Sequence, residues 1–265
     1  MSTERSAWLE TADGVRLHAL LADVPDPLAV LVLCHGLTTD RDEHGAFVAV
    51  RDRAVRAGIA VARFDFRAHG HSGGTNEQLR LAGARADADA VMTWLAAELD
   101  ASVPVIPLGL SFGGAAAVHI ATTAGPRCAA LALWYAVVDY EYQYGEGSPV
   151  PLTRMMRGAR GAADPEWSAM PVVGTDYHLP KGLIAELAGD ATRSRLAALE
   201  VPVLAWLGSR DRFVGFEPLR ELVATHPNIT IRVAHGAAHG FVLWRPWVVR
   251  HTVAWAAGVA QAART

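Results

Sequence analysis

The chain has 265 residues, with 24 lysines and arginines against 27 acids and a formal net charge of −3. Its length suits one α/β domain with a large buried core, and the small net charge excludes strong electrostatic attraction to nucleic acid or to an anionic membrane. The two cysteines, Cys34 and Cys128, are expected to be small buried apolar side chains and not a disulfide framework.

We expect a cytoplasmic protein. Residues 1–6 contain neither the basic nor the apolar region of a secretory signal peptide. No apolar run reaches the roughly 20 residues that are needed to cross a bilayer. Neither a basic stripe nor an RNA-type aromatic motif is present, so we expect no nucleic-acid partner and no membrane partner.

An antiparallel hairpin is predicted first, with strands at 7–11 and 15–21 on either side of the turn signal Asp13-Gly14. Strands and helices then alternate, which predicts a mostly parallel sheet flanked by helices. The predicted strands lie at 28–34, 59–64, 103–108, 129–138, 201–208 and 229–234. The predicted helices lie at 46–57, 79–99, 114–121 and 244–262.

The buried strand 28–34 ends in His35-Gly36-Leu37. Acyl transfer needs two N–H donors aimed at the oxyanion, and one of them commonly comes from the loop after an early strand. Gly36 lets the backbone approach a substrate closely, and the Leu37 N–H is the predicted donor. We interpret His35 as a structural residue that holds this loop.

Side chains of metal-binding type follow this loop at Asp40, Asp42, Glu43 and His44. We interpret Asp40 as the cap of the next helix and the other acids as residues of its first turn, where the helix dipole favours negative charge. His69 and His71 lack ligand spacing to other donors and are interpreted as structural. We therefore expect no metal and no cofactor.

The segment Gly109–Gly113 has the form Gly-x-Ser-x-Gly, with Ser111 at its centre. The apolar strand 103–108 precedes it, and the small-residue helix 114–121 follows it. A serine on such a sharp turn has an exposed hydroxyl at a helix N-terminus, where free N–H groups favour negative charge. The segment therefore predicts a nucleophile elbow, in which the glycines avoid collisions and the Phe112 N–H is the second oxyanion donor.

A serine hydroxyl needs a base that takes its proton, and the base needs a carboxylate that fixes its tautomer. Asp211 and His239 each follow a predicted strand, and the ends of parallel strands meet at one edge of a sheet. Asp139, which follows the predicted strand 129–138, is an alternative acid. His235 is an alternative base, but it comes directly off its strand, whereas His239 lies in a glycine-flanked loop that can reach the serine.

The alternation of strands and helices is lost between residues 139 and 196, which are rich in aromatic residues, methionine, glycine, proline and acids. Such a cluster needs an apolar surface to cover. We predict a cap subdomain at 139–196 over a core made of 1–138 and 197–265. The residues predicted to bind the substrate are Tyr135, Tyr140, Tyr142 and Trp167.

These motifs resemble the α/β-hydrolase superfamily over nearly the whole chain. They comprise His35-Gly36, residues 64–72, the elbow, residues 208–211 and residues 238–240. The resemblance implies the α/β-hydrolase fold with a small cap between two late strands. It implies that Ser111 is the nucleophile, His239 the general base and then acid, and Asp211 the orienting acid. It also implies that Leu37 and Phe112 form the oxyanion hole.

Within this superfamily, residues 38–44 are most similar to bacterial acyl-thioesterases and serine aminopeptidase-like esterases. The expected activity is hydrolysis of an acyl thioester or a carboxylic ester through an acyl-enzyme. The expected partner is a small acyl substrate, free or carried by coenzyme A or acyl carrier protein. The alternatives are an aminopeptidase or amidase on the same triad, and a lyase or ligand-binding protein that does not hydrolyse acyl groups.

Overall fold

The computed structural model describes residues 4–145, 147–150, 169–171, 178–180, 183, 185–186 and 189–264. Many residues of the predicted cap, and Trp167 among them, lie outside these ranges. The division of the chain into a core of 1–138 and 197–265 and a cap of 139–196 therefore stays a prediction.

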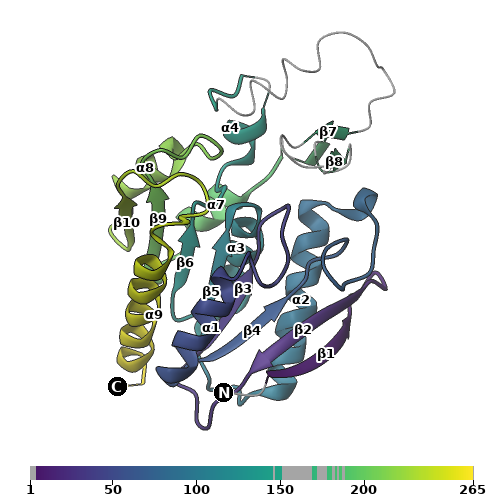
Figure 1. The fold of residues 1–265 in the computed structure, drawn as a ribbon, viewed down its shortest axis with the longest axis vertical. Helices are drawn as coiled ribbons and strands as arrows, with labels where there is room; N and C mark the ends of the chain where they lie inside the picture. Colours follow the sequence, from purple (N-terminus) through teal and green to yellow (C-terminus); the bar gives the residue numbers. More distant parts are fainter. Residues whose placement is uncertain are drawn as a thin grey trace.

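One sheet of eight strands runs through the described part of the chain, in the order β1-β2-β4-β3-β5-β6-β9-β10 (Figure 1). Its strands are β1 Glu4–Glu10, β2 Arg16–Ala22, β3 Val30–Cys34, β4 Ala60–Phe64, β5 Val105–Leu110, β6 Leu131–Trp134, β9 Val203–Gly208 and β10 Ile229–Ala234. Strand β2 is antiparallel to β1 and β4, and the other neighbouring pairs are parallel. The sheet confirms the predicted α/β fold.

The N-terminal hairpin is confirmed as well. Strands β1 and β2 pair in antiparallel register, and Gly14 has the left-handed φ of 80° that the turn requires. Two backbone hydrogen bonds close the turn, from Thr11 N to Val15 O and from Gly14 N to Thr11 O, each 2.9 Å long. The hairpin extends the sheet beyond β4 and ends it with an antiparallel edge.

The central strands are buried along their whole length, as apolar runs predict; β4 is buried too, although it contains Arg63. The carboxyl ends of two neighbouring strands, β5 and β6, differ from the prediction by two residues or more. Strand β5 continues to Leu110 and so ends directly at the elbow. Strand β6 ends at Trp134, well before residue 138, because Tyr135 has a left-handed φ of 36° that no extended strand accommodates.

The helices cover the sheet on both faces. They are α1 Ala46–Arg56, α2 Leu81–Glu98, α3 Gly114–Thr123, α8 Glu217–Val223 and α9 Arg245–Ala262. Helix α1 packs against α9, and α2 packs against α3. After β3 the chain adds β4 on one side and then crosses back to add β5 on the other. Because such crossovers are right-handed, α1 and α2 lie on opposite faces (Figure 1).

This strand order creates a crevice. The loops that follow β3 and β5 lead to opposite faces of the sheet, so they diverge at the carboxyl ends of two neighbouring strands. Ligands of open α/β sheets bind at such a switch point. The loop after β3 begins with His35, and the turn after β5 begins with Ser111.

Between β6 and β9 the chain leaves the sheet. The described elements of this stretch are α4 Tyr140–Tyr144, β7 Ala169–Pro171, β8 His178–Pro180 and α7 Thr192–Ala197. Strands β7 and β8 pair in antiparallel register as a separate small sheet. Figure 1 shows α4, β7 and β8 at one end of the molecule, beyond the end of β6.

The interpretation of the acids before α1 is wrong. Helix α1 has Gly45 as its N-cap, with no side-chain cap and no acid in its first turn. Residues 43–45 all have left-handed φ values, so the acids before Gly45 belong to a separate turn and not to the first turn of α1. Asp40 instead accepts a hydrogen bond from the Asp42 N–H, at 2.9 Å, within its own loop.

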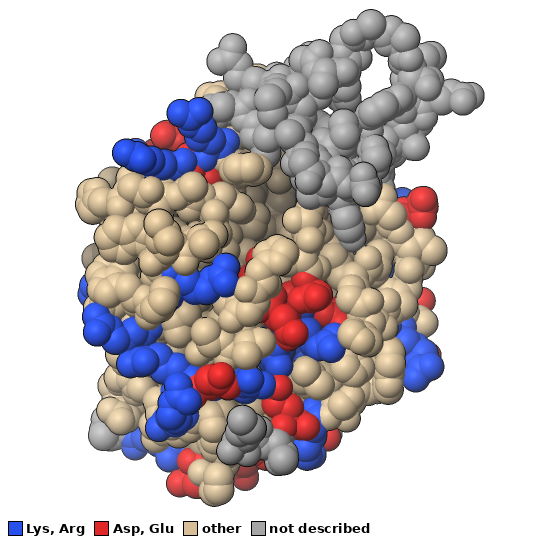
Figure 2. All heavy atoms as spheres, viewed as in Figure 1, with Lys and Arg blue, Asp and Glu red and all other residues tan. Residues whose placement is uncertain are grey.

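Basic and acidic side chains are interspersed on the face shown in Figure 2, in keeping with the small net charge. Charged side chains also pair below the surface: the buried Arg63 forms an ion pair of 2.7 Å with Glu4 and a second one with Asp42. None of the described helices has the length and apolar character of a membrane span.

Candidate active site

Ser111 lies on a strained turn between β5 and α3. Its φ is 50°, in the left-handed region that non-glycine residues rarely adopt. A Cβ on Gly109 would lie 2.6 Å from the Ala117 Cβ, and a Cβ on Gly113 would lie 2.2 Å from the Cys34 carbonyl oxygen. The predicted steric reason for both glycines is therefore confirmed.

The peptide unit after Ser111 has a fixed orientation. The Ser111 carbonyl accepts a hydrogen bond of 3.0 Å from the Val137 N–H. In a trans peptide the C=O and the following N–H point in opposite directions, so the Phe112 N–H points away from Val137. Tyr140 holds the next peptide, because its buried hydroxyl donates to the Phe112 carbonyl at 2.9 Å.

The loop after β3 is fixed in the same way by His35, which is fully buried. The Phe66 N–H donates to its Nε2 at 3.0 Å, so the proton is on Nδ1, which lies 2.7 Å from the Gly36 carbonyl. Burial lowers the pKa of His35 well below its usual value, which keeps this tautomer neutral. The structural role predicted for His35 is confirmed, and the Leu37 N–H points away from the His35 ring.

His69 holds the same loop from the other side. Its Nε2 lies 2.5 Å from the Leu37 carbonyl and its Nδ1 lies 2.8 Å from the Arg67 carbonyl. The peptide units on both sides of Leu37 therefore have hydrogen-bonded carbonyls. This placement agrees with the structural interpretation of His69.

Asp211 and His239 form a hydrogen-bonded pair. Asp211 Oδ2 lies 2.8 Å from His239 Nδ1, and its side chain is fully buried. The other carboxylate oxygen accepts from the Phe213 N–H at 2.7 Å. An Nδ1–H that donates to a carboxylate leaves Nε2 free to act as a base.

Two aromatic rings hold the His239 imidazole. The Phe213 ring stacks on it with 5.1 Å between centroids, and the Tyr135 ring meets it edge-on at 4.3 Å. Tyr135 itself packs edge-on against Phe241 at 4.8 Å. The imidazole is therefore positioned by packing as well as by Asp211.

The predicted alternatives for acid and base lie elsewhere. Asp139 is the N-cap of α4, where it accepts from the Tyr142 N–H at 2.9 Å. Its other oxygen pairs with Arg193 at 3.1 Å. His235 is exposed, whereas the His239 ring contacts Asp211 directly.

Ser111 and His239 line one cavity of about 310 Å³, at the low end of the range for small-molecule sites. Its apolar lining includes Leu37, Leu110, Phe213, Val214 and Val242. Its polar lining includes Thr38, Thr39, Glu43, His44, Tyr135 and Arg245. The cavity that Ser111 lines thus has both apolar and polar side chains in its wall.

The four predicted substrate-binding residues have different places. Tyr135 lines the cavity, while Tyr140 lies behind the elbow and binds its backbone. Tyr142 lines a different pocket and donates to Glu217 at 2.9 Å. Trp167 is outside the described residues. Tyr144, one helical turn beyond Tyr140, lines the cavity instead.

Sequence reasoning missed the cavity residues Glu43, Phe213 and Arg245. Phe213 follows Asp211 by two residues, so its closeness could have been inferred. Glu43 comes from the turn before α1 and Arg245 from the start of α9. The left-handed turn at residues 43–45 and the packing of α9 against α1 bring them to the cavity. No local pattern carries that information.

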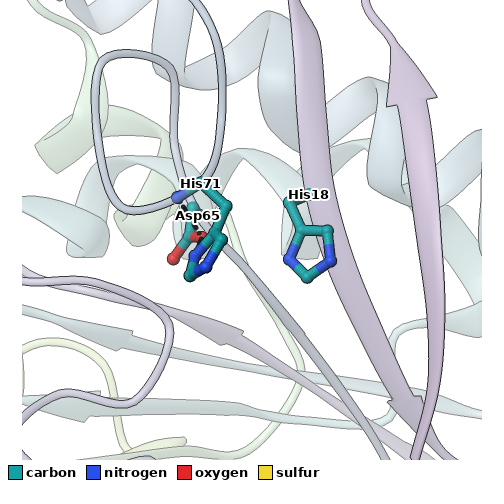
Figure 3. A group of neighbouring side chains, drawn as sticks. All are labelled: His18, Asp65 and His71. Atoms are coloured by element: carbon teal, nitrogen blue, oxygen red, sulfur yellow. Dashed lines mark hydrogen bonds and ion pairs between the residues drawn. The ribbon is translucent and has the colours of Figure 1, made fainter.

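A group of metal-binding side chains lies away from this cavity. His18 comes from β2, and Asp65 and His71 come from the loop after β4; their ligand atoms lie within 4.8 Å of one another (Figure 3). The guanidinium of Arg41 forms an ion pair with Asp65 and lies 3.0 Å from His71 Nδ1. Asp65 also accepts from the backbone N–H of His71 at 2.9 Å. The Arg41 guanidinium thus supplies a positive charge beside the Asp65 carboxylate. Its contacts link the loop after β3 to the loop after β4.

Fold and site together define a serine hydrolase of the α/β-hydrolase superfamily. A model of the family described as serine aminopeptidase, S33, matches residues 25–181, which is more than half of the chain. The chain belongs to this family.

The chain is similar in sequence to a lipase and in fold to several solved structures. A monoacylglycerol lipase of Mycolicibacterium smegmatis is 28% identical over 237 residues, which cover 81% of this chain and 82% of that protein. The structure of Est1E from Butyrivibrio proteoclasticus with bound ferulic acid has a TM-score of 0.78 at 22% identity, over 94% of this chain and 97% of that one. The esterase domain of a Rhodothermus marinus protein has a TM-score of 0.70 at 23% identity, over 96% and 98%. The likeness to these two structures shows the fold.

Proposed function

We propose that this protein hydrolyses carboxylic esters of apolar acyl groups by a Ser111–His239–Asp211 triad and an acyl-enzyme intermediate. The observation that carries the proposal is the 2.8 Å hydrogen bond between Asp211 and His239 beside a cavity that Ser111 also lines. Such a pair leaves the histidine Nε2 as a base, which is what an unactivated serine hydroxyl needs.

In the first half of the reaction His239 Nε2 takes the Ser111 proton while Oγ attacks the acyl carbonyl. The negative charge on the carbonyl oxygen is held by the Leu37 and Phe112 N–H groups, whose peptide carbonyls are fixed by hydrogen bonds. The C–O bond to the leaving alcohol then breaks, and the alcohol receives its proton from His239.

In the second half of the reaction a water molecule takes the place of the alcohol. His239 removes its proton, the resulting hydroxide attacks the acyl-enzyme, and Ser111 regains its proton as the carboxylic acid leaves. No redox step and no co-reactant besides water is needed. The same steps hydrolyse a thioester, with a thiol as the leaving group.

The cavity lining supports an apolar acyl group. Phe213 and Val242 line it and are also exposed, by 44% and 72%, so an apolar surface continues from the cavity to the outside. One relative is a lipase, and solved structures of similar fold include proteins described as esterases, which favours an oxygen ester over a thioester. The predicted cap at 139–196 would cover this opening.

The test is intact-protein mass spectrometry after brief mixing with p-nitrophenyl esters and coenzyme A thioesters of graded chain length. An acyl adduct or turnover in the wild type that is lost in Ser111→Ala, with unchanged circular dichroism, is the expected result. Faster turnover of esters than of thioesters would support the ester preference. Unchanged turnover by Ser111→Ala would refute the mechanism, and a wild type without adduct or turnover would favour the lyase or binding alternatives.

An aminopeptidase or amidase is a second candidate, favoured by the name of the family and by the Glu43 carboxyl in the cavity. A buried carboxylate can bind the ammonium group of an aminoacyl substrate. Turnover of aminoacyl p-nitroanilides is compared with that of the matching acyl p-nitrophenyl esters. A higher kcat/KM for the anilides would replace the ester proposal by this one.

A further inference from the structure

We propose that Glu43 is a positioning residue of the active site, whose carboxyl holds the Gly36 N–H and so fixes the loop that presents the Leu37 N–H to the oxyanion. This inference rests on the proposed acyl transfer. It gives a role to a carboxyl group that the triad chemistry does not use.

The contacts of Glu43 are specific and buried. Its Oε2 accepts from the Gly36 N–H at 2.8 Å and from the Thr39 hydroxyl at 2.5 Å. The residue is 6% exposed, so water does not compete effectively for these donors. The carboxyl therefore connects the first and the last part of the loop between β3 and α1.

The backbone around Glu43 is strained. Glu43 and His44 have φ values of 48° and 50°, in a region that side chains other than glycine rarely adopt. Local strain of this kind persists where the surrounding structure enforces it, and it concentrates at functional sites. Here the strained turn directs the Glu43 side chain back beneath residues 36–39.

The carboxyl is close to the nucleophile. A Cβ added to Gly36 would lie 3.6 Å from Glu43 Oε2 and 3.7 Å from the Ser111 Cβ. Gly36 is therefore enclosed between the carboxyl and the serine. If the carboxyl withdraws, the peptide that carries the Leu37 N–H keeps its contact with His35 but loses the anchor at the Gly36 N–H. A shift of the Leu37 donor that this loss allows reduces its interaction with the oxyanion.

The proposed role of Glu43 needs an oxygen acceptor within hydrogen-bond distance of the Gly36 N–H and the Thr39 hydroxyl. Glu43→Gln keeps a carbonyl oxygen at the same reach and loses the charge. Glu43→Asp keeps the charge but withdraws the oxygens by one methylene group. Glu43→Leu removes the acceptor altogether. Glu200→Leu, at an exposed position, is the matched control.

Two rates are measured for each variant: phosphonylation of Ser111 by a fluorophosphonate, and kcat and KM for a p-nitrophenyl ester. The loss of an oxyanion donor costs about 10²–10³ in kcat, so we expect the Leu and Asp variants to lose at least about tenfold in both rates with KM nearly unchanged. We expect Glu43→Gln to stay within about threefold of the wild type, because an amide oxygen still accepts both hydrogen bonds.

Three results would overturn the inference. They are a folded Leu variant with wild-type rates, a Gln variant as slow as the Leu variant, and a fall in rate that comes from KM alone. Should Glu43→Leu not fold, the comparison of the Gln and Asp variants decides the same question. A wild type that neither reacts with the fluorophosphonate nor hydrolyses esters would instead refute the proposed function and this inference with it.

Discussion

At the scale of single residues, hydrogen bonds to neighbouring groups decide which side chains can do chemistry. Asp211 and Asp139 are both carboxylates that follow strands, yet only Asp211 contacts the imidazole of His239. Asp139 is committed to the α4 N-terminus and to Arg193. His35 and His239 differ likewise, because both nitrogens of His35 bind backbone groups.

This difference predicts opposite outcomes for two matched variants. Asp211→Asn should lower kcat by up to about 10⁴-fold, because the amide no longer stabilises the imidazolium or fixes the productive tautomer. Asp139→Asn should keep near wild-type turnover, because asparagine also caps helices well. Ester hydrolysis by the two purified variants measures both effects, and an inactive Asp139→Asn beside an active Asp211→Asn would reassign the acid.

At the scale of elements, the elbow depends on how closely β5, α3 and the loop after β3 approach one another. Gly113 is at the tightest point, since a Cβ there would lie 2.2 Å from the Cys34 carbonyl oxygen and 2.5 Å from that of His35. Gly258 lies in the interior of α9, and a Cβ there would meet no atom within 4 Å beyond the backbone of its own helix. The first glycine is required by packing, and the second is not.

Alanine at these two positions should therefore change stability in opposite directions. Gly113→Ala should lower the free energy of unfolding by about 1–3 kcal/mol, because the overpacked turn must shift. Gly258→Ala should raise it by about 0.5–1 kcal/mol, because alanine costs less conformational entropy in a helix. Urea unfolding followed by circular dichroism measures both, and a stabilised Gly113→Ala would contradict this account of the elbow.

At the scale of the whole molecule, burial of a titratable side chain makes the stability of the protein depend on pH. The pKa of His35 lies well below the usual 6.5 because the ring is desolvated. Below about pH 6.5 the unfolded chain binds a proton that the folded protein does not, so the free energy of unfolding falls as the pH falls. The slope for one such group approaches about 1.4 kcal/mol per pH unit.

Replacing the ring should reduce this slope. We expect urea unfolding of His35→Gln between pH 5 and pH 7 to show a weaker loss of stability on acidification than the wild type, whatever the absolute stability of the variant. Glu43 and Asp87 have pKa values raised by burial, which gives a slope of opposite sign, but both are present in the two proteins and cancel in the comparison. Equal slopes would show that His35 is not the group responsible.

The sequence alone determined the features that depend on local patterns. Continuous apolar runs identified the buried strands, Asp13-Gly14 identified the hairpin, and the glycines around Ser111 identified the elbow, because each rests on the period of a strand or on the conformation of a few bonds. The chain order of Ser111, Asp211 and His239 followed from the same motifs.

Only the tertiary structure decided which distant groups meet. It joined Asp211 to His239 and placed Tyr140 behind the elbow. It also directed Glu43, which the sequence assigns to the start of a helix, to the Gly36 N–H of its own loop. The Glu43 contacts follow from the left-handed turn at residues 43–45, and Arg245 reaches the cavity from α9, which packs against α1. Long-range contacts of this kind leave no periodic trace in a sequence, because they are set by the path of the whole chain and not by neighbouring residues.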